Sequence, residues 1–404
     1  MKNITLTEVL LILIGLTSLL GQWQRLSTPF GLISLHEILL LALVAFSLYR
    51  HRSAWLDILK QPVIWLGIAW VGWLLLITII NSQITDNFQL LQVGLAYWLR
   101  LVLYALSWFS LGAYLKINPE RRRIVLNGLM AWLAVQLLFG LGQYLLLPDT
   151  RQLVYLGWDD HLSRAMGTLL DPGFFGLLMV FGAVLSFDRY LESAKLQKLI
   201  FSWWPILFAG FVLGLALSFS RASYIAYISA FLIYAFLKRQ RIIWLTLPLL
   251  IMAILLIPKD GGGEGQKLLR TNSIEARTEV LSYHTQDFSG LNWLIGRGWY
   301  YEGSLQLHRQ ALSEEKTEFT ATSHARAVDN TYLHILFSAG IPGLFLFGLI
   351  LMTLAWKLRL APTAEAILGA VIIHSLFSTA LLYPWVWLIG GGVVVLSLTQ
   401  LDQK

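Results

Sequence analysis

The run PVIWLGIAWVGWLLLITII, residues 62–80, contains no charged side chain. At about 1.5 Å per residue, a helix of this length crosses the roughly 30 Å hydrocarbon core of a bilayer. Similar runs recur along the chain: 57% of its 404 residues are hydrophobic and only 13% are charged. A soluble domain carries about 25% charged residues. The sequence therefore predicts an all-α integral membrane protein.

About twelve apolar stretches are long enough to be transmembrane helices. They lie near 4–21, 31–49, 62–80, 93–115, 124–147, 173–188, 199–218, 222–237, 242–257, 331–355, 363–381 and 383–399. The first resembles a signal sequence, but it is long enough to span and GQWQR at 21–25 offers no small-residue cleavage site. We therefore expect an uncleaved first helix.

Charge composition and cysteine content exclude several classes of function. The chain has no cysteine, so neither a disulfide framework nor thiolate chemistry is expected. The net charge of +7 is modest and dispersed, which argues against a nucleic-acid partner.

The connections between the predicted spans alternate in Lys and Arg content. Seventeen of these residues fall on one side, and the short connections on the other side hold only four, Arg25, Arg151, Arg164 and Arg221. The positive-inside rule then places both termini in the cytoplasm. The predicted organisation is nine spans in residues 1–257, a large periplasmic loop over 258–330 and three spans in 331–404. Within the loop we expect a helix from Asn272 and a polar helical stretch over 305–319.

Charged side chains inside a span are costly and need a reason. Arg100 lies seven residues into the span 93–115, about 10 Å deep, and Glu37 lies at a similar depth in the second span. Arg100 and Glu37 could form a structural ion pair, or Arg100 could extend to the membrane surface. Alternatively, Arg100 helps to bind an anion. His374 is also inside a span, and a lone histidine there is more often a packing residue.

Arginines recur near the predicted outer surface, at Arg164, Arg221, Arg277 and Arg297. Arg suits bidentate phosphate binding, so several that converge would hold a diphosphate. Taken singly, each could be a plain interface or ion-pair residue. Arg221 is the most informative, because it stands between two apolar runs with Ser220 on one side.

Two further groups near the outer surface have two interpretations each. Asp329 and Asn330 could cap the helix that follows, and they would also place a carboxylate where a base could meet a substrate hydroxyl. Trp299 and Tyr300 could stack on sugar rings, or they could belong to an aromatic belt at the membrane interface.

Taken in order, these motifs resemble the O-antigen ligase and O-antigen polymerase superfamily of bacterial polysaccharide assembly. The pieces are Arg164-x-x-Gly-Thr-x-x-Asp-Pro172, Ser220-Arg221-Ala222, the Arg277 segment, Gly296-Arg297-Gly298, Asp329-Asn330-x-Tyr-Leu333 and Ala339-Gly-Ile-x-Gly343. The resemblance runs from about Arg164 to the C-terminus. Upstream it consists only of hydrophobic pattern and span number.

The resemblance implies a metal-independent, cofactor-free glycosyltransferase of the GT-C type in the bacterial inner membrane. Such an enzyme takes a glycan from undecaprenyl diphosphate at the outer face and transfers it to a hydroxyl of lipid A–core, in the ligases, or of another lipid-linked glycan, in the polymerases. Asp329 and Arg221 would be catalytic. The diphosphate would contact Arg164, Arg221, Arg277, Arg297 and Arg100, and the glycan or acceptor Asn330, His324, Trp299 and Tyr300.

One position departs from the family pattern. Family ligases carry His-Asn where this chain has Asp329-Asn330. The difference favours a polymerase, or a ligase with another acceptor, over a lipid A–core ligase; His324 and His334 are nearby substitutes for the missing histidine.

Two other functions remain as alternatives. A transporter or flippase for an anionic or lipid-linked substrate would need a continuous polar path, and the cytoplasmic half supplies few polar groups inside the spans. A non-catalytic scaffold would leave the cost of Arg100 and Arg221 unexplained.

Overall fold

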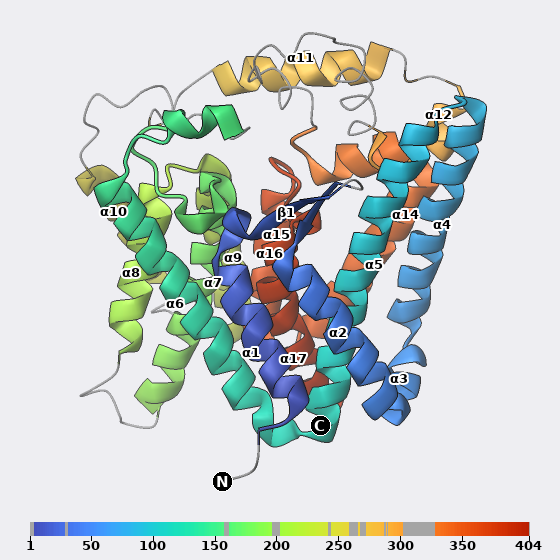
Figure 1. The fold of residues 1–404 in the computed structure, drawn as a ribbon. Helices are drawn as coiled ribbons and strands as arrows, with labels where there is room; N and C mark the ends of the chain where they lie inside the picture. The colour runs from blue at the N-terminus through green and yellow to red at the C-terminus, as the bar shows by residue number, and fades with distance from the viewer. Residues whose placement is uncertain are drawn as a thin grey trace.

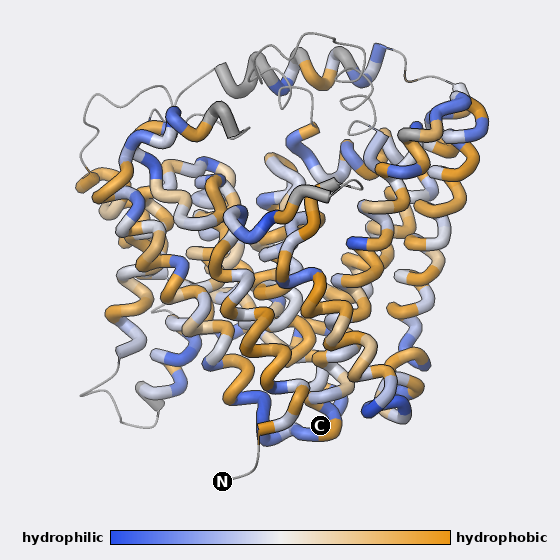
Figure 2. The backbone as a smooth tube through the Cα atoms, viewed as in Figure 1, coloured by the Kyte–Doolittle hydropathy of each residue, from blue (hydrophilic) through white to orange (hydrophobic). Residues whose placement is uncertain are grey.

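The computed structural model describes residues 4–28, 31–156, 161–195, 203–240, 244–257, 266, 272–286, 288, 290–301 and 328–403. Long helices run roughly side by side between two ends (Figure 1). Both termini lie at one end, and helix α11 lies across the opposite end. Hydrophobic residues cover the lengths of the helices, whereas hydrophilic residues concentrate toward the two ends (Figure 2). This distribution fits a bundle immersed in a bilayer.

Every one of the predicted apolar stretches contains a helix. The helices are α1 (Leu6–Leu19), α2 (Leu35–Arg50), α3 (Arg52–Leu59), α4 (Pro62–Ile84), α5 (Phe88–Ile117), α6 (Arg122–Leu146), α7 (Pro172–Lys195), α8 (Trp204–Leu217), α9 (Arg221–Lys238), α10 (Thr246–Leu256), α11 (Asn272–Gln286), α12 (Asn292–Ile295), α14 (Thr331–Leu358), α15 (Pro362–His374), α16 (Pro384–Val386) and α17 (Gly392–Leu401). Short turns of 3-10 or π-helix are η1 (Gly21–Gln24), η2 (Pro119–Arg121), η3 (Arg151–Leu156), η4 (Gly167–Leu169), η9 (Ala380–Leu382) and η10 (Trp387–Gly391).

Length and composition qualify six helices of the described residues as membrane spans: 62–84, 90–117, 119–146, 172–193, 331–358 and 384–401. Helices α1, α8, α10 and α15 are apolar but shorter. The all-α membrane class is confirmed, and the number of twelve spans stays a prediction. The helix expected from Asn272 is present as α11. The polar stretch expected at 305–319 lies outside the described residues.

Helix α7 is the centre of the bundle. In the most apolar 18-residue stretch of α7, 78% of the residues are buried, against 28% in the corresponding stretch of α4. It packs on α8, α9 and α15, which supply the largest part of the core. The lower burial of α4, α5 and α6 leaves one side of each for lipid.

A small β-hairpin was not predicted. Strands β1 (Arg25–Thr28) and β2 (Gly31–Ser34) pair antiparallel, with Arg25 opposite Ser34. The second span was expected from residue 31, but α2 begins only at Leu35. The Glu37 carboxylate accepts a hydrogen bond from the Ser34 N–H at 2.9 Å, which starts the helix there.

The expected span over 363–381 is interrupted. Helix α15 ends at His374, and a turn over 375–379 precedes η9. The Thr331 N–H donates to the carbonyl oxygens of Ser375, at 2.9 Å, and Ser378, at 3.0 Å. Hydropathy does not reveal this turn, because the groups that accept its hydrogen bonds are backbone carbonyls, and hydropathy measures side chains only.

Helix α14 is kinked where the segment after α12 docks on it. Pro342 has no N–H, so the Ser338 carbonyl lacks its helical partner, and the Gly298 N–H donates to it at 3.0 Å. The Arg297 N–H donates to the Phe337 carbonyl at 2.8 Å. Two motifs that are separate in the sequence, around Arg297 and around Gly340, therefore form one structural unit.

We expect Gly340→Ala to destabilise this unit. Gly340 has φ of +67°, and a Cβ atom there would lie 2.4 Å from the Leu294 carbonyl oxygen. Strain of this kind costs about 1–3 kcal/mol, so the thermal unfolding midpoint of the detergent-purified protein should fall. Gly128→Ala in α6 is the matched control, since a Cβ atom at that position would have no neighbour within 4 Å. Equal midpoints for both variants would contradict the role of the kink.

Candidate functional site

The turn after α15 gathers side chains from two other segments at the end of the bundle that carries α11. The Arg277 Nη2 donates to the Phe377 carbonyl at 3.0 Å, and the Asn330 Nδ2 donates to the Leu376 carbonyl at 2.9 Å. The Arg277 Nε lies 3.7 Å from the Asp329 Oδ2. Arg277 and Asp329, which are 52 positions apart, are therefore brought together.

Asn330 fixes the start of α14 and thereby the place of Asp329. Its Oδ1 accepts hydrogen bonds from the N–H groups of Tyr332, at 2.9 Å, and Leu333, at 3.0 Å. This confirms the helix-capping interpretation for Asn330. The Asp329 side chain is 59% exposed, so its carboxylate remains accessible at the mouth of the bundle.

A chain of polar side chains continues inward from the same turn. His374 is 1% exposed; its Nδ1 lies 2.8 Å from the Ser378 Oγ and its Nε2 lies 3.2 Å from the Ser223 Oγ. The Ser223 Oγ lies 2.8 Å from the Gly173 carbonyl and 2.9 Å from the Ser220 Oγ. Both ring nitrogens of His374 have partners, as expected of a packing histidine. This series of hydrogen-bonded side chains joins the starts of α7 and α9 to the turn that binds Arg277.

Arg221 is the first residue of α9, and Ser220 caps that helix by accepting from the Ser223 N–H at 3.3 Å. The half-buried Arg221 side chain thus starts from a helix N-terminus, where backbone N–H groups and the helix dipole also favour anions.

Arg164 supports the turn between α8 and α9. It is 8% exposed, and its Nε donates to the Ser218 carbonyl at 3.0 Å and its Nη2 to the Phe219 carbonyl at 3.4 Å. Phe219 has φ of +48°, a left-handed conformation that needs support from its surroundings. Arg164 therefore stabilises the turn that presents Arg221.

Arg297 lies among aromatic rings. Its Cζ is 5.5 Å from the centre of the Phe288 ring and 5.7 Å from that of Tyr301. Its Nη2 is buried and has no hydrogen-bond partner among the described residues. Cation–π contacts thus hold the Arg297 guanidinium, and its Nη2 remains a donor without an acceptor among the described residues.

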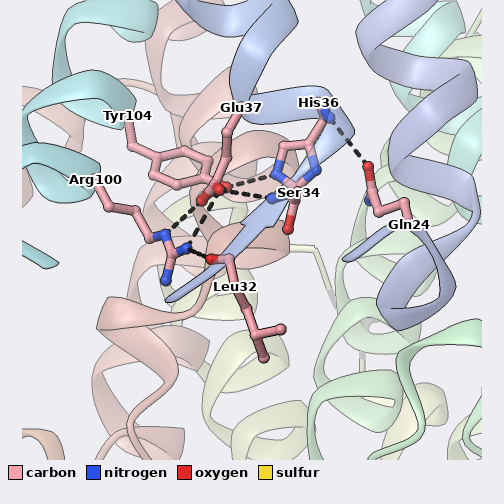
Figure 3. A network of polar contacts seen from close by, with 7 residues as sticks. All are labelled: Gln24, Leu32, Ser34, His36, Glu37, Arg100 and Tyr104. Atoms are coloured by element: carbon pink, nitrogen blue, oxygen red, sulfur yellow. Dashed lines mark hydrogen bonds and ion pairs between the residues drawn. The ribbon is translucent and has the colours of Figure 1, made fainter. Parts of the chain in front are cut away.

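Arg100 belongs to a separate network that fastens the hairpin to α5 (Figure 3). Its Nε lies 2.5 Å from the Glu37 Oε1, and its Nη2 donates to the Leu32 carbonyl at 2.6 Å. The structural Arg–Glu pair is therefore confirmed. The network continues to Tyr104, whose hydroxyl lies 2.5 Å from the His36 Nε2.

We expect Arg100→Ala to destabilise the protein more than loss of an exposed pair. Breaking a buried pair costs about 3–5 kcal/mol, and 28% exposure of the Arg100 side chain lowers the expectation to about 1–3 kcal/mol. Lys60→Ala removes the pair of Lys60 with Asp57, exposed at 76% and 45%, and should cost less than about 1 kcal/mol. Thermal unfolding midpoints measure both, and equal shifts would contradict the structural role of Arg100.

The aromatic candidates Trp299 and Tyr300 are in contact, with ring centres 5.4 Å apart, but they differ in their other neighbours. Trp299 is 1% exposed, with its ring centre 6.1 Å from that of Trp70 and 5.4 Å from that of His334. Neither alternative, sugar stacking or an interfacial belt, describes this core position. Tyr300 stacks on Tyr97 with centres 3.5 Å apart. His334 is buried inside α14, and His324 lies outside the described residues.

Sequence reasoning missed the chain from Ser378 through His374 to Ser223. The serines beside Arg221 were visible, but their partner His374 is 151 positions further along than Ser223. The acceptors of Arg277 and Asn330 are backbone carbonyls, which leave no signal in side-chain identity.

The family model described as O-antigen ligase matches residues 206–348. The matched part runs from α8 into α14 and includes Arg221, Arg277, Arg297 and Asp329, whereas Arg100 and Arg164 precede it. No curated protein matches the chain. Through residues 206–348, the chain is therefore similar to the O-antigen ligase family, which supports the resemblance to the O-antigen ligase and polymerase superfamily.

Proposed function

We propose that the chain is a metal-independent GT-C-type glycosyltransferase that moves a glycan from undecaprenyl diphosphate to an acceptor hydroxyl at the outer face of the bacterial inner membrane. One observation carries the proposal: within the family-matched segment, Arg277 and Asp329 meet at 3.7 Å at the mouth of the bundle. An accessible carboxylate beside an arginine supplies both functions that this transfer needs.

The arginines would act on the leaving group. As the bond between the anomeric carbon and the diphosphate oxygen breaks, negative charge develops on the diphosphate, and preorganised donors stabilise that charge more in the transition state than in the ground state. Arg277 and Arg221 are the principal candidates. Arg297 has a donor nitrogen without a partner among the described residues. Arg164 would act indirectly, by stabilising the turn before α9. Arg100, which is paired with Glu37, would contribute to diphosphate binding from further away.

Asp329 would act on the acceptor. Its carboxylate takes the proton of the acceptor hydroxyl, the oxygen bonds to the anomeric carbon, and undecaprenyl diphosphate leaves with the electron pair of the broken bond. Asn330 would place Asp329 through its cap on α14. Tyr300 and His324 stay proposed contacts of the glycan or acceptor. Trp299 is buried, so it would act by packing beneath the residues that contact the glycan.

The orientation follows from the charge bias. Both termini would lie in the cytoplasm and the loop over 258–330 in the periplasm, and the common end of the two termini in Figure 1 supports this. Asp329 in place of the histidine of the family ligases favours a polymerase slightly over a lipid A–core ligase.

Lipid-linked intermediates in cells that lack the protein test the proposal. Accumulated single undecaprenyl-linked units on the periplasmic side would indicate a polymerase, and unattached long chains a ligase. Units trapped on the cytoplasmic side would indicate a flippase instead. An unchanged pool of intermediates would contradict a role in glycan assembly.

A further inference from the structure

A groove of about 410 Å³ lies far from the candidate site, where α9 ends and α15 begins. It is lined by Leu232, Ile233, Phe236, Leu237, Arg359 and Glu365. Helix α14 begins beside Arg277 and runs down the bundle before Arg359 follows it, so the groove belongs to the end that carries both termini. Its volume is enough for a small headgroup and the first part of a chain.

The wall that α9 contributes is apolar and faces outward. Leu232 is 42% exposed and Phe236 is 81% exposed, and the two lie four residues apart on one face of the helix. On a bundle that crosses a bilayer, such a face meets lipid chains. The groove therefore continues into the hydrocarbon region.

A carboxyl group and a guanidinium group border the groove without pairing with each other. The Glu365 Oε2 is buried and has no hydrogen-bond partner among the described residues. Arg359 is exposed and held over the Trp356 ring, with its Cζ 3.8 Å from the ring centre. No ion pair within 4.0 Å involves either side chain in the part of the chain that the structure describes.

We propose that this groove binds an aminophospholipid. The lipid phosphate would pair with Arg359, and its primary ammonium group would donate hydrogen bonds to the Glu365 carboxylate. An acyl chain would lie along Leu232 and Phe236. A buried carboxylate oxygen without a partner is costly, and a primary ammonium group supplies three donors. An anionic lipid without an amine would pair with Arg359 alone, and an uncharged lipid would pair with neither group.

Native mass spectrometry of the full chain in detergent tests the proposal with phosphatidylethanolamine, phosphatidylcholine and phosphatidylglycerol as separate probes. We expect phosphatidylethanolamine to bind about tenfold tighter than phosphatidylcholine, whose quaternary amine donates no hydrogen bond. Glu365→Gln should remove that preference. Arg359→Ala should weaken binding of phosphatidylethanolamine and phosphatidylglycerol alike. Glu192→Gln, an exposed carboxylate on α7 at the same end, is the matched control and should bind as the unchanged protein does.

Three results would overturn the proposal. Equal affinities for the three lipids in the unchanged protein would show that no headgroup is recognised. Tighter binding of phosphatidylglycerol would indicate an anionic-lipid site that uses Arg359 alone. A preference for phosphatidylethanolamine that survives Glu365→Gln would place the recognition elsewhere. The comparison of lipids on the unchanged protein needs no variant, so it holds even if a variant folds poorly.

Discussion

Asp329→Asn is expected to lower the turnover of glycan transfer by about 10²–10⁴-fold, because an amide cannot take the proton of the acceptor hydroxyl. The amide keeps the size of the side chain and its place beside the Arg277 Nε, 3.7 Å away. The apparent KM for the lipid-linked donor should therefore change much less than the turnover. Initial rates of chain growth or transfer in isolated membranes measure both quantities.

Asp149→Asn is the matched control for this variant. Asp149 also bonds to an arginine at the end of the bundle that carries α11, with the Arg151 Nη2 2.6 Å from its Oδ2. Hydrogen bonds from Arg151 lower the pKa of Asp149 to about 2, so the carboxylate is charged at any neutral assay pH. Its replacement should leave the rate unchanged. If Asp329→Asn kept a rate within a few-fold of the unchanged protein, Asp329 would not be the base.

Arg221→Ala should reduce transfer by about 10²–10³-fold, the usual cost of one lost donor to a developing anion. Arg221→Lys should recover part of the rate, since lysine keeps the charge but loses the bidentate geometry. The length distribution of surface glycan, measured at equal amounts of membrane-inserted protein, gives the readout in cells.

Arg151→Ala serves as the control for Arg221. Arg151 is another arginine at the end that carries α11, but it precedes the family-matched segment and already pairs with Asp149. Its loss should leave the glycan unchanged. Unchanged long-chain glycan in Arg221→Ala cells would exclude a catalytic role for Arg221.

The helices could be predicted because bilayer thickness imposes a length on apolar runs. The run at 62–80 became α4 (Pro62–Ile84), and the other expected stretches each contain a helix. The two errors have one physical cause. Backbone hydrogen bonds between adjacent strands hold the hairpin at 25–34, and the Thr331 N–H from a distant segment holds the turn after His374. An apolar side-chain pattern records neither kind of bond.

The charged residues of the site could be predicted from the sequence, but most of the contacts that they make could not. Arg100 and Glu37 could be paired because both were expected at the same depth, and burying either alone would be costly. The contact of Arg277 with Asp329 could not be derived, because it depends on how α11 lies over the turn that holds Phe377. Likewise, Pro342 could be recognised as a helix breaker, but the Gly298 N–H that donates to the freed Ser338 carbonyl could not be identified.

The most direct test of the central claim is the release of undecaprenyl diphosphate by the purified full chain in vesicles. The vesicles would contain lipid-linked glycan and acceptor extracted from cells that lack the protein. We predict release in proportion to glycan transferred, with loss of both in the Asp329→Asn and Arg221→Ala variants. Glycan that stays on its lipid carrier while the carrier moves across the bilayer would contradict the account.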